Sequence, residues 1–119
     1  MMIFENPLIL IPVITGLIFV IAGFVMLKFP PKKINGLYGY RTKSSMKNQE
    51  RWDFAQNYSA KEMMKLGFVL ALTGLFGFLF EPQEMVGMII GLGLMILMVI
   101  LLIVRVESAI KKKFEENQI

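Results

Sequence analysis

The chain has 119 residues, 55% of them apolar, and its mean hydropathy of +0.61 exceeds that of an ordinary water-soluble domain. It has no cysteine and no histidine, which excludes disulfides, cysteine nucleophiles and cysteine-based metal sites, and removes the commonest general base. We therefore expect neither an enzyme nor a bound cofactor or metal. The net charge of +4 does not indicate nucleic-acid binding, because its distribution is that of a membrane protein.

Three apolar runs predict transmembrane helices. A run of 22 uncharged residues lies between Glu5 and Lys28, and the last run holds 20, so at 1.5 Å rise per residue each reaches across a hydrocarbon core of roughly 30 Å. The middle run has only 15 uncharged residues, but Lys61 and Lys65 share a helix face and can snorkel to the interface, which lengthens the span. The predicted spans are 6–27, 61–80 and 85–104.

Basic residues set the expected orientation. Nine of the 13 lie in residues 28–65 and four in 105–119, which the three spans place on one side of the membrane. The positive-inside rule puts that side in the cytoplasm, with the N-terminus and the tight, proline-containing 81–84 turn outside. The first apolar run has no basic n-region and no small-residue cleavage site, so we expect a retained helix and not a signal peptide.

A polar segment, residues 28–60, joins the first two spans. Its glycines predict a loop, and Ser44 or Ser45 is expected to cap an amphipathic helix over 44–58 that lies at the cytoplasmic interface. Trp52, Ala55 and Ser59 fall on one stripe of it. The expected fold is thus all-α: an integral membrane three-transmembrane-helix bundle with a cytoplasmic amphipathic interfacial helix between helices one and two.

Residues 35–65, NGLYGYRTKSSMKNQERWDFAQNYSAKEMMK, resemble the SdpI/YfhL family of bacterial membrane proteins. The resemblance rests on a Gly-Tyr-Arg-Thr box after the first span, on an asparagine and a tryptophan at the helix start, and on a second asparagine five residues later. It implies a minimal three-helix member that gives immunity to, or senses, a membrane-active peptide toxin without catalysis. The candidate functional residues are Asn35, Gly39, Tyr40, Arg41, Thr42, Asn48, Trp52 and Asn57.

Each candidate also has a purely structural interpretation. Arg41 is suited to binding lipid phosphate or an acidic partner, or equally to capping helix carbonyls. Asn48, Trp52 and Asn57 are suited to lining a polar pocket, or to an interfacial structural role. Five lysines are expected either to recruit anionic lipid or only to fix topology: Lys28, Lys32, Lys33, Lys43 and Lys47.

Small residues recur at helical spacing in all three spans, and such faces let helices approach closely. We expect them to pack the bundle, with homodimerisation as the alternative use. These residues are Gly16, Gly23, Gly67, Ala71, Gly74, Gly87 and Gly91.

The acidic residues are expected to lie in solvent. Glu50, Asp53 and Glu62 are assigned to a solvated helix face compensated by Arg51 and Lys61, which supplies too few oxygen ligands for a divalent cation. Glu107, just beyond the third span, is expected to pair weakly with Arg105 or Arg41.

Three functions compete on these grounds. The first is toxin immunity or sensing in the bacterial plasma membrane, which follows from the resemblance. The second is a small homo-oligomeric transporter or channel, favoured by the glycine faces. The third is a tether that holds a cytoplasmic regulator through the basic loop and the tail lysines Lys111, Lys112 and Lys113. The expected partners are therefore the bilayer, anionic lipid and a peptide or regulator protein, and not nucleic acid.

Overall fold

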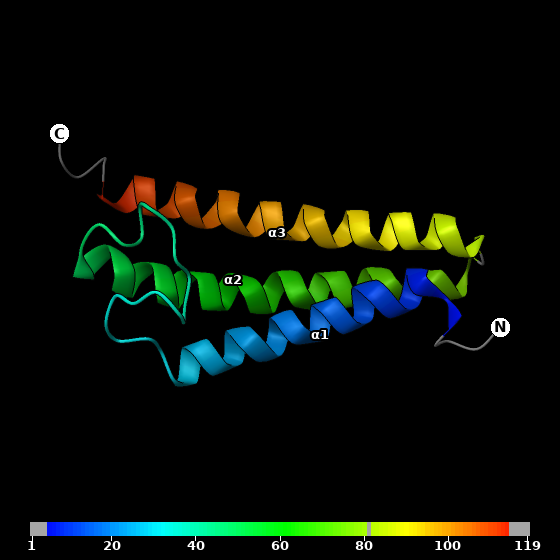
Figure 1. The fold of residues 1–119 in the computed structure, drawn as a ribbon, viewed down its shortest axis with the longest axis horizontal. Helices are drawn as coiled ribbons and strands as arrows, with labels where there is room; N and C mark the ends of the chain where they lie inside the picture. The colour runs from blue at the N-terminus through cyan, green and yellow to red at the C-terminus, as the bar shows by residue number, and fades with distance from the viewer. Residues whose placement is uncertain (1–4, 81, 115–119) are drawn as a thin grey trace.

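The computed structural model describes residues 5–80 and 82–114, and their regular structure is entirely helical. Three long helices, α1 (Pro7–Lys28), α2 (Gln49–Leu75) and α3 (Glu84–Phe114), run alternately up and down along an elongated body of 55 × 29 × 20 Å (Figure 1). A short 3-10 turn, η2 (Phe76–Phe78), follows α2. The expectation of an all-helical chain is confirmed for these residues, which form three long helices and not the expected three spans with a separate interfacial helix.

Local signals define α1. The side chain of Asn6 caps the helix by accepting a hydrogen bond from the Leu8 amide at 3.0 Å, and Pro7 occupies the first turn, where a missing amide hydrogen costs nothing. The same Asn6 side chain donates to the carbonyl of Gly77 at 3.1 Å. This bond fastens the start of α1 to η2, just after the end of α2.

The start of α2 differs from the expectation. The helix begins at Gln49 and is capped by Asn48, whose side chain accepts from the Arg51 amide at 2.9 Å. Ser45 does not cap it, because its hydroxyl is buried in the preceding turn and bonds to the carbonyl of Tyr40. The expected separate helix over 44–58 is wrong in this respect: α2 runs without a break from Gln49 to Leu75.

The helix α3 extends well beyond the predicted end of the third span. Its 31 residues correspond to about 46 Å, against about 30 Å for a hydrocarbon core. Residues 105–114, expected to belong to a tail, are therefore helical and project α3 beyond its apolar part. Residues 115–119 of that tail lie outside the described residues.

Glycines bring the helices together. A Cβ atom built on Gly67 would lie 2.6 Å from the carbonyl oxygen of Gly16, so α1 and α2 touch backbone to backbone at this crossing. A Cβ on Gly91 of α3 would lie 3.0 Å from the Cβ of Ile11 on α1. The remaining small residues of the predicted faces also lie at helix contacts: Gly23 against Ala60, Gly74 against Val13, Gly87 against Pro7, and Ala71 against Gly16.

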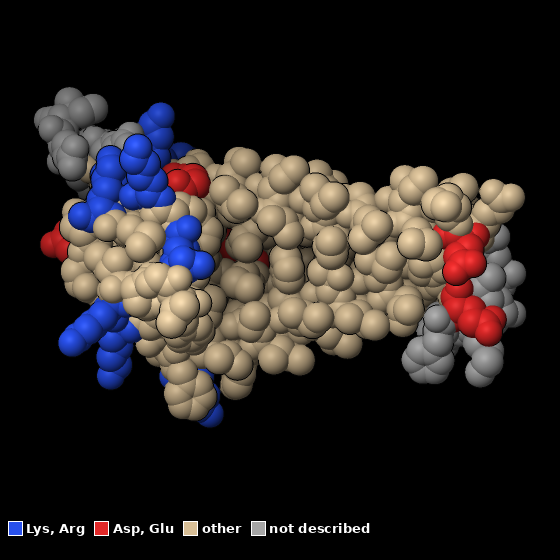
Figure 2. Space-filling view, in the orientation of Figure 1, with Lys and Arg blue, Asp and Glu red and all other residues tan. Residues whose placement is uncertain are grey.

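The outer surface of the bundle is apolar. Both α1 and α3 are long and apolar enough to cross a membrane. An 18-residue stretch of each has a mean hydropathy of 2.8 in α1 and 3.0 in α3, and only 28% and 22% of these stretches are buried inside the molecule. Core helices of a soluble protein would be covered far more completely. In Figure 2 the lysines and arginines in view gather at one end together with some acidic residues, only acidic residues are seen at the other end, and the surface between is almost free of charge. This is the surface of a membrane protein.

Candidate functional site

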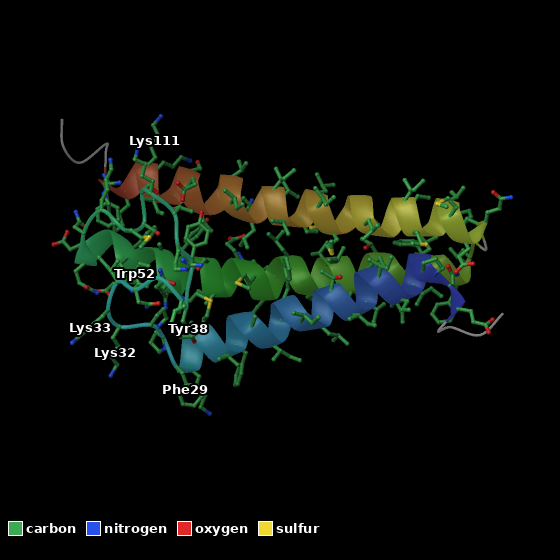
Figure 3. All side chains as sticks on the ribbon, viewed as in Figure 1. Phe29, Lys32, Lys33, Tyr38, Trp52 and Lys111 are labelled. Atoms are coloured by element: carbon green, nitrogen blue, oxygen red, sulfur yellow. The ribbon has the colours of Figure 1, made fainter. Side chains whose placement is uncertain are left out.

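The candidate site lies at the basic end of the bundle, where residues 29–48 connect α1 to α2. We call these residues the strap. The strap folds back over the first half of α2 and reaches α3 (Figure 1). Figure 3 shows that the labelled residues of the strap lie at the same end as Trp52 and Lys111. The residues of the expected Gly-Tyr-Arg-Thr box all belong to the strap.

A buried amide of α2 holds the backbone of the strap. The Tyr40 amide donates to Oε1 of Gln56 at 2.6 Å, and Nε2 of Gln56 donates back to the Tyr40 carbonyl at 2.8 Å. Gln56 is 2% exposed, so both bonds are shielded from water. Gln56 was not among the residues expected to be functional, although it follows Trp52 by four residues and so lies on the same helical stripe.

Gly39 makes this approach possible. Its φ of +111° lies in the region that side chains rarely adopt. A Cβ atom there would also lie 2.6 Å from Oε1 of Gln56 and 2.7 Å from Cγ of Pro31. The glycine is thus required by both the backbone conformation and the space that Gln56 fills.

A second contact between α2 and the strap is made by Trp52, whose side chain is completely buried. Its indole Nε1 donates to the carbonyl of Pro31 at 2.6 Å, and the side chain of Gln49, one turn earlier, donates to the carbonyl of Lys32, also at 2.6 Å. The stripe of Trp52, Ala55 and Ser59, which was expected to lie at the membrane interface, is buried in the protein. It packs into the protein and is not free to lie on the membrane surface.

The third contact joins the strap to α3. The carboxylate of Glu107 accepts hydrogen bonds from three hydroxyls: Tyr40 at 2.7 Å, Thr42 at 2.9 Å and Ser44 at 2.8 Å. Burial raises the pKa of the Tyr40 phenol above its ordinary value, and the hydrogen bond to Glu107 raises it further. The expected pairing of Glu107 with an arginine is wrong, because the strap hydroxyls occupy the carboxylate.

Below the strap, an ion pair joins α2 to α3. Arg105 donates from Nε to Oε2 of Glu62 at 2.8 Å and from Nη2 to Oε1 at 3.2 Å, and Nζ of Lys65 lies 3.6 Å from the same Oε1. Glu62 is only 4% exposed. Its assignment to a solvated face with Lys61 is therefore wrong, since it is a buried acid paired across two helices.

A pocket of about 400 Å³ opens between the end of α1, the strap and α2. Asn57 lines it together with Asp53, whereas Asn48 caps the helix and Trp52 is buried against Pro31. The expected convergence of Asn48, Trp52 and Asn57 on one polar pocket is therefore not found. The remaining lining residues are Met26, Leu27, Pro30, Pro31, Lys32, Gln49 and Gln56.

The other candidate residues lie nearer the surface. Asn35 accepts from the amides of Leu37 and Tyr38 at 2.9 and 2.7 Å and closes a turn of the strap. Arg41 is exposed, and its side chain makes no hydrogen bond to the residues that the structure describes. Arg51 is buried with its guanidinium 5.3 Å from the Phe114 ring, so it is not on a solvated face with Glu50. Within the described ranges no cluster of acidic side chains could hold a metal ion.

Comparison with known proteins gives two matches. The model of the SdpI/YfhL protein family matches residues 32–106, which include nearly all of the strap, the whole of α2 and most of α3. An uncharacterized protein, YfhL, of Bacillus subtilis (strain 168) is 48% identical over 60 residues, which cover 50% of this chain and 54% of the relative. The chain thus aligns with about half the length of that relative. No solved structure matches.

Proposed function

Because the chain belongs to the SdpI/YfhL protein family, we propose that it is a non-catalytic protein of the bacterial plasma membrane that gives immunity to, or senses, a membrane-active peptide. The observation that carries the proposal is the strap, which is bonded at once to α2 through Gln56 and to α3 through Glu107. It lies almost wholly within the matched region, and its hydrogen bonds reach two different helices.

The proposed arrangement has three membrane spans. These are α1, the apolar second half of α2 and the apolar part of α3, with the strap in the cytoplasm and the N-terminus outside. The gathering of basic side chains at the strap end supports this orientation, because positively charged loops are retained in the cytoplasm. The ion pair of Glu62 and Arg105 then lies at the cytoplasmic edge of the bilayer.

The strap is suited to reporting on the membrane. A peptide that inserts beside the lipid-exposed faces of α2 and α3 changes the packing of these two helices, and the strap is attached to both. Relative movement of Gln56 and Glu107 must then stretch or break bonds of 2.6–2.9 Å. Insertion of the peptide thereby changes the shape of the strap around Arg41, whose exposed side chain is accessible to a cytoplasmic partner.

Survival of cells under a panel of membrane-active peptides tests the proposal. A deletion strain is complemented with the wild type, with Glu107→Gln, which removes the charge that holds three hydroxyls, or with Arg41→Ala. Glu50→Gln serves as the control, because Glu50 is an exposed acid on α2 with no bond to the described residues. We expect wild type and control to protect and the other two variants to fail at equal protein levels. Equal survival of all strains, the deletion included, would contradict the proposal.

Topology is measured separately. Because the chain has no cysteine, single substitutions give unambiguous labelling sites. Lys47→Cys in the strap should react with a membrane-impermeant maleimide only after cells are opened, and Gln83→Cys in the α2–α3 turn should react in intact cells. The reverse pattern would refute the orientation.

A further inference from the structure

A second hollow lies on the bundle, away from the strap. It has a volume of about 330 Å³, and we call it the α2–α3 groove. One wall is Tyr58 of α2, and the other is a single face of α3, since its members recur at helical spacing. The lining residues are Tyr58, Val104, Arg105, Ser108, Ala109 and Lys112.

The groove is lined by groups that bind phosphate. Arg105 and Lys112 supply positive charge, and Tyr58 and Ser108 supply hydroxyl donors. None of its lining residues is acidic. These positive charges and hydroxyl donors favour an anion with several acceptor oxygens over a cation or an apolar group.

Glu62 orients the arginine without neutralising the groove. It engages Nε and Nη2 of Arg105, while Nη1 has no acceptor among the described residues. The Arg105 side chain remains 50% exposed although its carboxylate partner is 5% exposed. Because Lys65 shares the same carboxylate at 3.6 Å, two cations surround one buried acid and a positive excess faces the groove. A fixed, half-exposed guanidinium is prepared for a further anion at little loss of side-chain entropy.

The position of the groove identifies the kind of anion. Val104 is the last residue of the uncharged run of α3, and it is exposed together with Ile103 and Ile100 on the apolar side. From Val104 to Lys112 the helix rises about 12 Å, enough to cross a headgroup layer of roughly 5–8 Å. The groove therefore has an apolar end in the bilayer and a basic end among the headgroups. A ligand that matches both ends carries acyl chains and a phosphate.

We propose that the α2–α3 groove binds the phosphate of an anionic phospholipid from the leaflet on the strap side, between Arg105 and Lys112, with its acyl chains along Val104. This site shares no residue with the strap; it rests on the proposed membrane span of α3 and not on the proposed immunity or sensing.

The test measures lipid retained by the purified full-length chain. The protein is taken from micelles with defined phosphatidylglycerol or phosphatidylcholine, and bound lipids are counted by native mass spectrometry. We expect one phosphatidylglycerol bound in preference to phosphatidylcholine. Lys112→Gln should weaken this binding about fivefold, the value of one lysine near a membrane surface. Arg105→Lys keeps the positive charge but loses the forked donors of the guanidinium group, so it should also weaken phosphatidylglycerol binding.

Lys111→Gln is the matched control. It makes the same charge change one residue away, and Lys111 is exposed, does not line the groove, and lies on the side of α3 away from α2 (Figure 3). We expect its affinity for phosphatidylglycerol to equal that of the wild type. Equal losses in Lys111→Gln and Lys112→Gln would mean diffuse attraction to charge and would overturn the proposal. Equal retention of both lipids, or displacement of the lipid by millimolar glycerol phosphate, would overturn it as well.

Discussion

Replacing Gln56 with methionine removes both hydrogen bonds to the Tyr40 backbone while it keeps the length of the side chain. The consequences for the two backbone groups differ. The Tyr40 carbonyl retains the hydroxyl of Ser45 at 3.1 Å, but its amide has no other acceptor among the described residues. One buried donor is therefore left unsatisfied, and one acceptor loses one of its two partners.

The expected cost follows from these two losses. An unsatisfied buried donor costs about 1–3 kcal/mol, and the second bond contributes about 1 kcal/mol. The free energy that keeps the strap closed at Tyr40 should fall by roughly 2–4 kcal/mol. At about 1.4 kcal/mol for each factor of ten, the open population of the strap rises roughly 30- to 700-fold.

Limited trypsin digestion measures the open population of the strap, because trypsin cleaves after basic residues and the strap exposes Arg41, Lys43 and Lys47. When opening is fast relative to cleavage, the cleavage rate follows the open population. We expect faster cleavage within 41–47 in Gln56→Met by the factor given above. Asn57→Met is the control, since it also replaces an amide by methionine at the next residue, where the side chain is exposed. Cleavage of the two variants within threefold of each other would refute the role of Gln56.

Two further predictions concern the helix crossing and the phenol. Gly67→Ala places a methyl 2.6 Å from the Gly16 carbonyl oxygen, so it should lower the free energy of unfolding in micelles by about 1–3 kcal/mol. Gly93→Ala is the control, because a Cβ there has no neighbour within 4 Å, and it should be neutral or stabilising. Equal effects of the two substitutions would contradict the close crossing of α1 and α2. Because the Tyr40 pKa is raised above 10.0, its bond to Glu107 persists as pH rises and is lost only at the folded-state pKa. In a pH titration, the tyrosinate absorbance of the folded wild type should therefore match that of Tyr40→Phe until the pH is about one unit above 10.0. Ionisation of one more tyrosine in the wild type than in Tyr40→Phe below that pH would show that Tyr40 is not protected.

The helical class and the two apolar helices were predictable because their signals are local. Uncharged runs of 22 and 20 residues are contiguous in the sequence, and Asn6 and Pro7 act within the first turn of α1. The helical stripe of Trp52, Ala55 and Ser59 was readable from the spacing, but it was expected at the membrane interface and is instead buried in the protein together with Gln56. The family resemblance, confirmed by the matches, came from the same segment.

The tertiary contacts were not predictable, because their partners are far apart in sequence. Glu107 lies 65 residues from Thr42, and Glu62 lies 43 residues from Arg105. A glutamate in a polar helical segment is usually solvated, so only the spatial arrangement of α2 and α3 identifies these two as paired. The start of α2 was misplaced for a related reason: Ser45 has the chemistry of a cap, but the carbonyl of Tyr40 competes for its hydroxyl.

In the proposed membrane arrangement, the length of α3 couples a change in the bilayer to the strap. The helix meets α1 at Gly91, and Glu107 lies 16 residues further along one continuous rod, about 24 Å away. A change of tilt of about 10° about that contact, well within the range that membrane helices adopt when bilayer thickness changes, displaces Glu107 by about 4 Å. The bonds from Tyr40, Thr42 and Ser44 are 2.7–2.9 Å long and cannot follow such a movement unless the strap moves too. A bilayer thinned by an inserted peptide would in this way pull the strap along or release it.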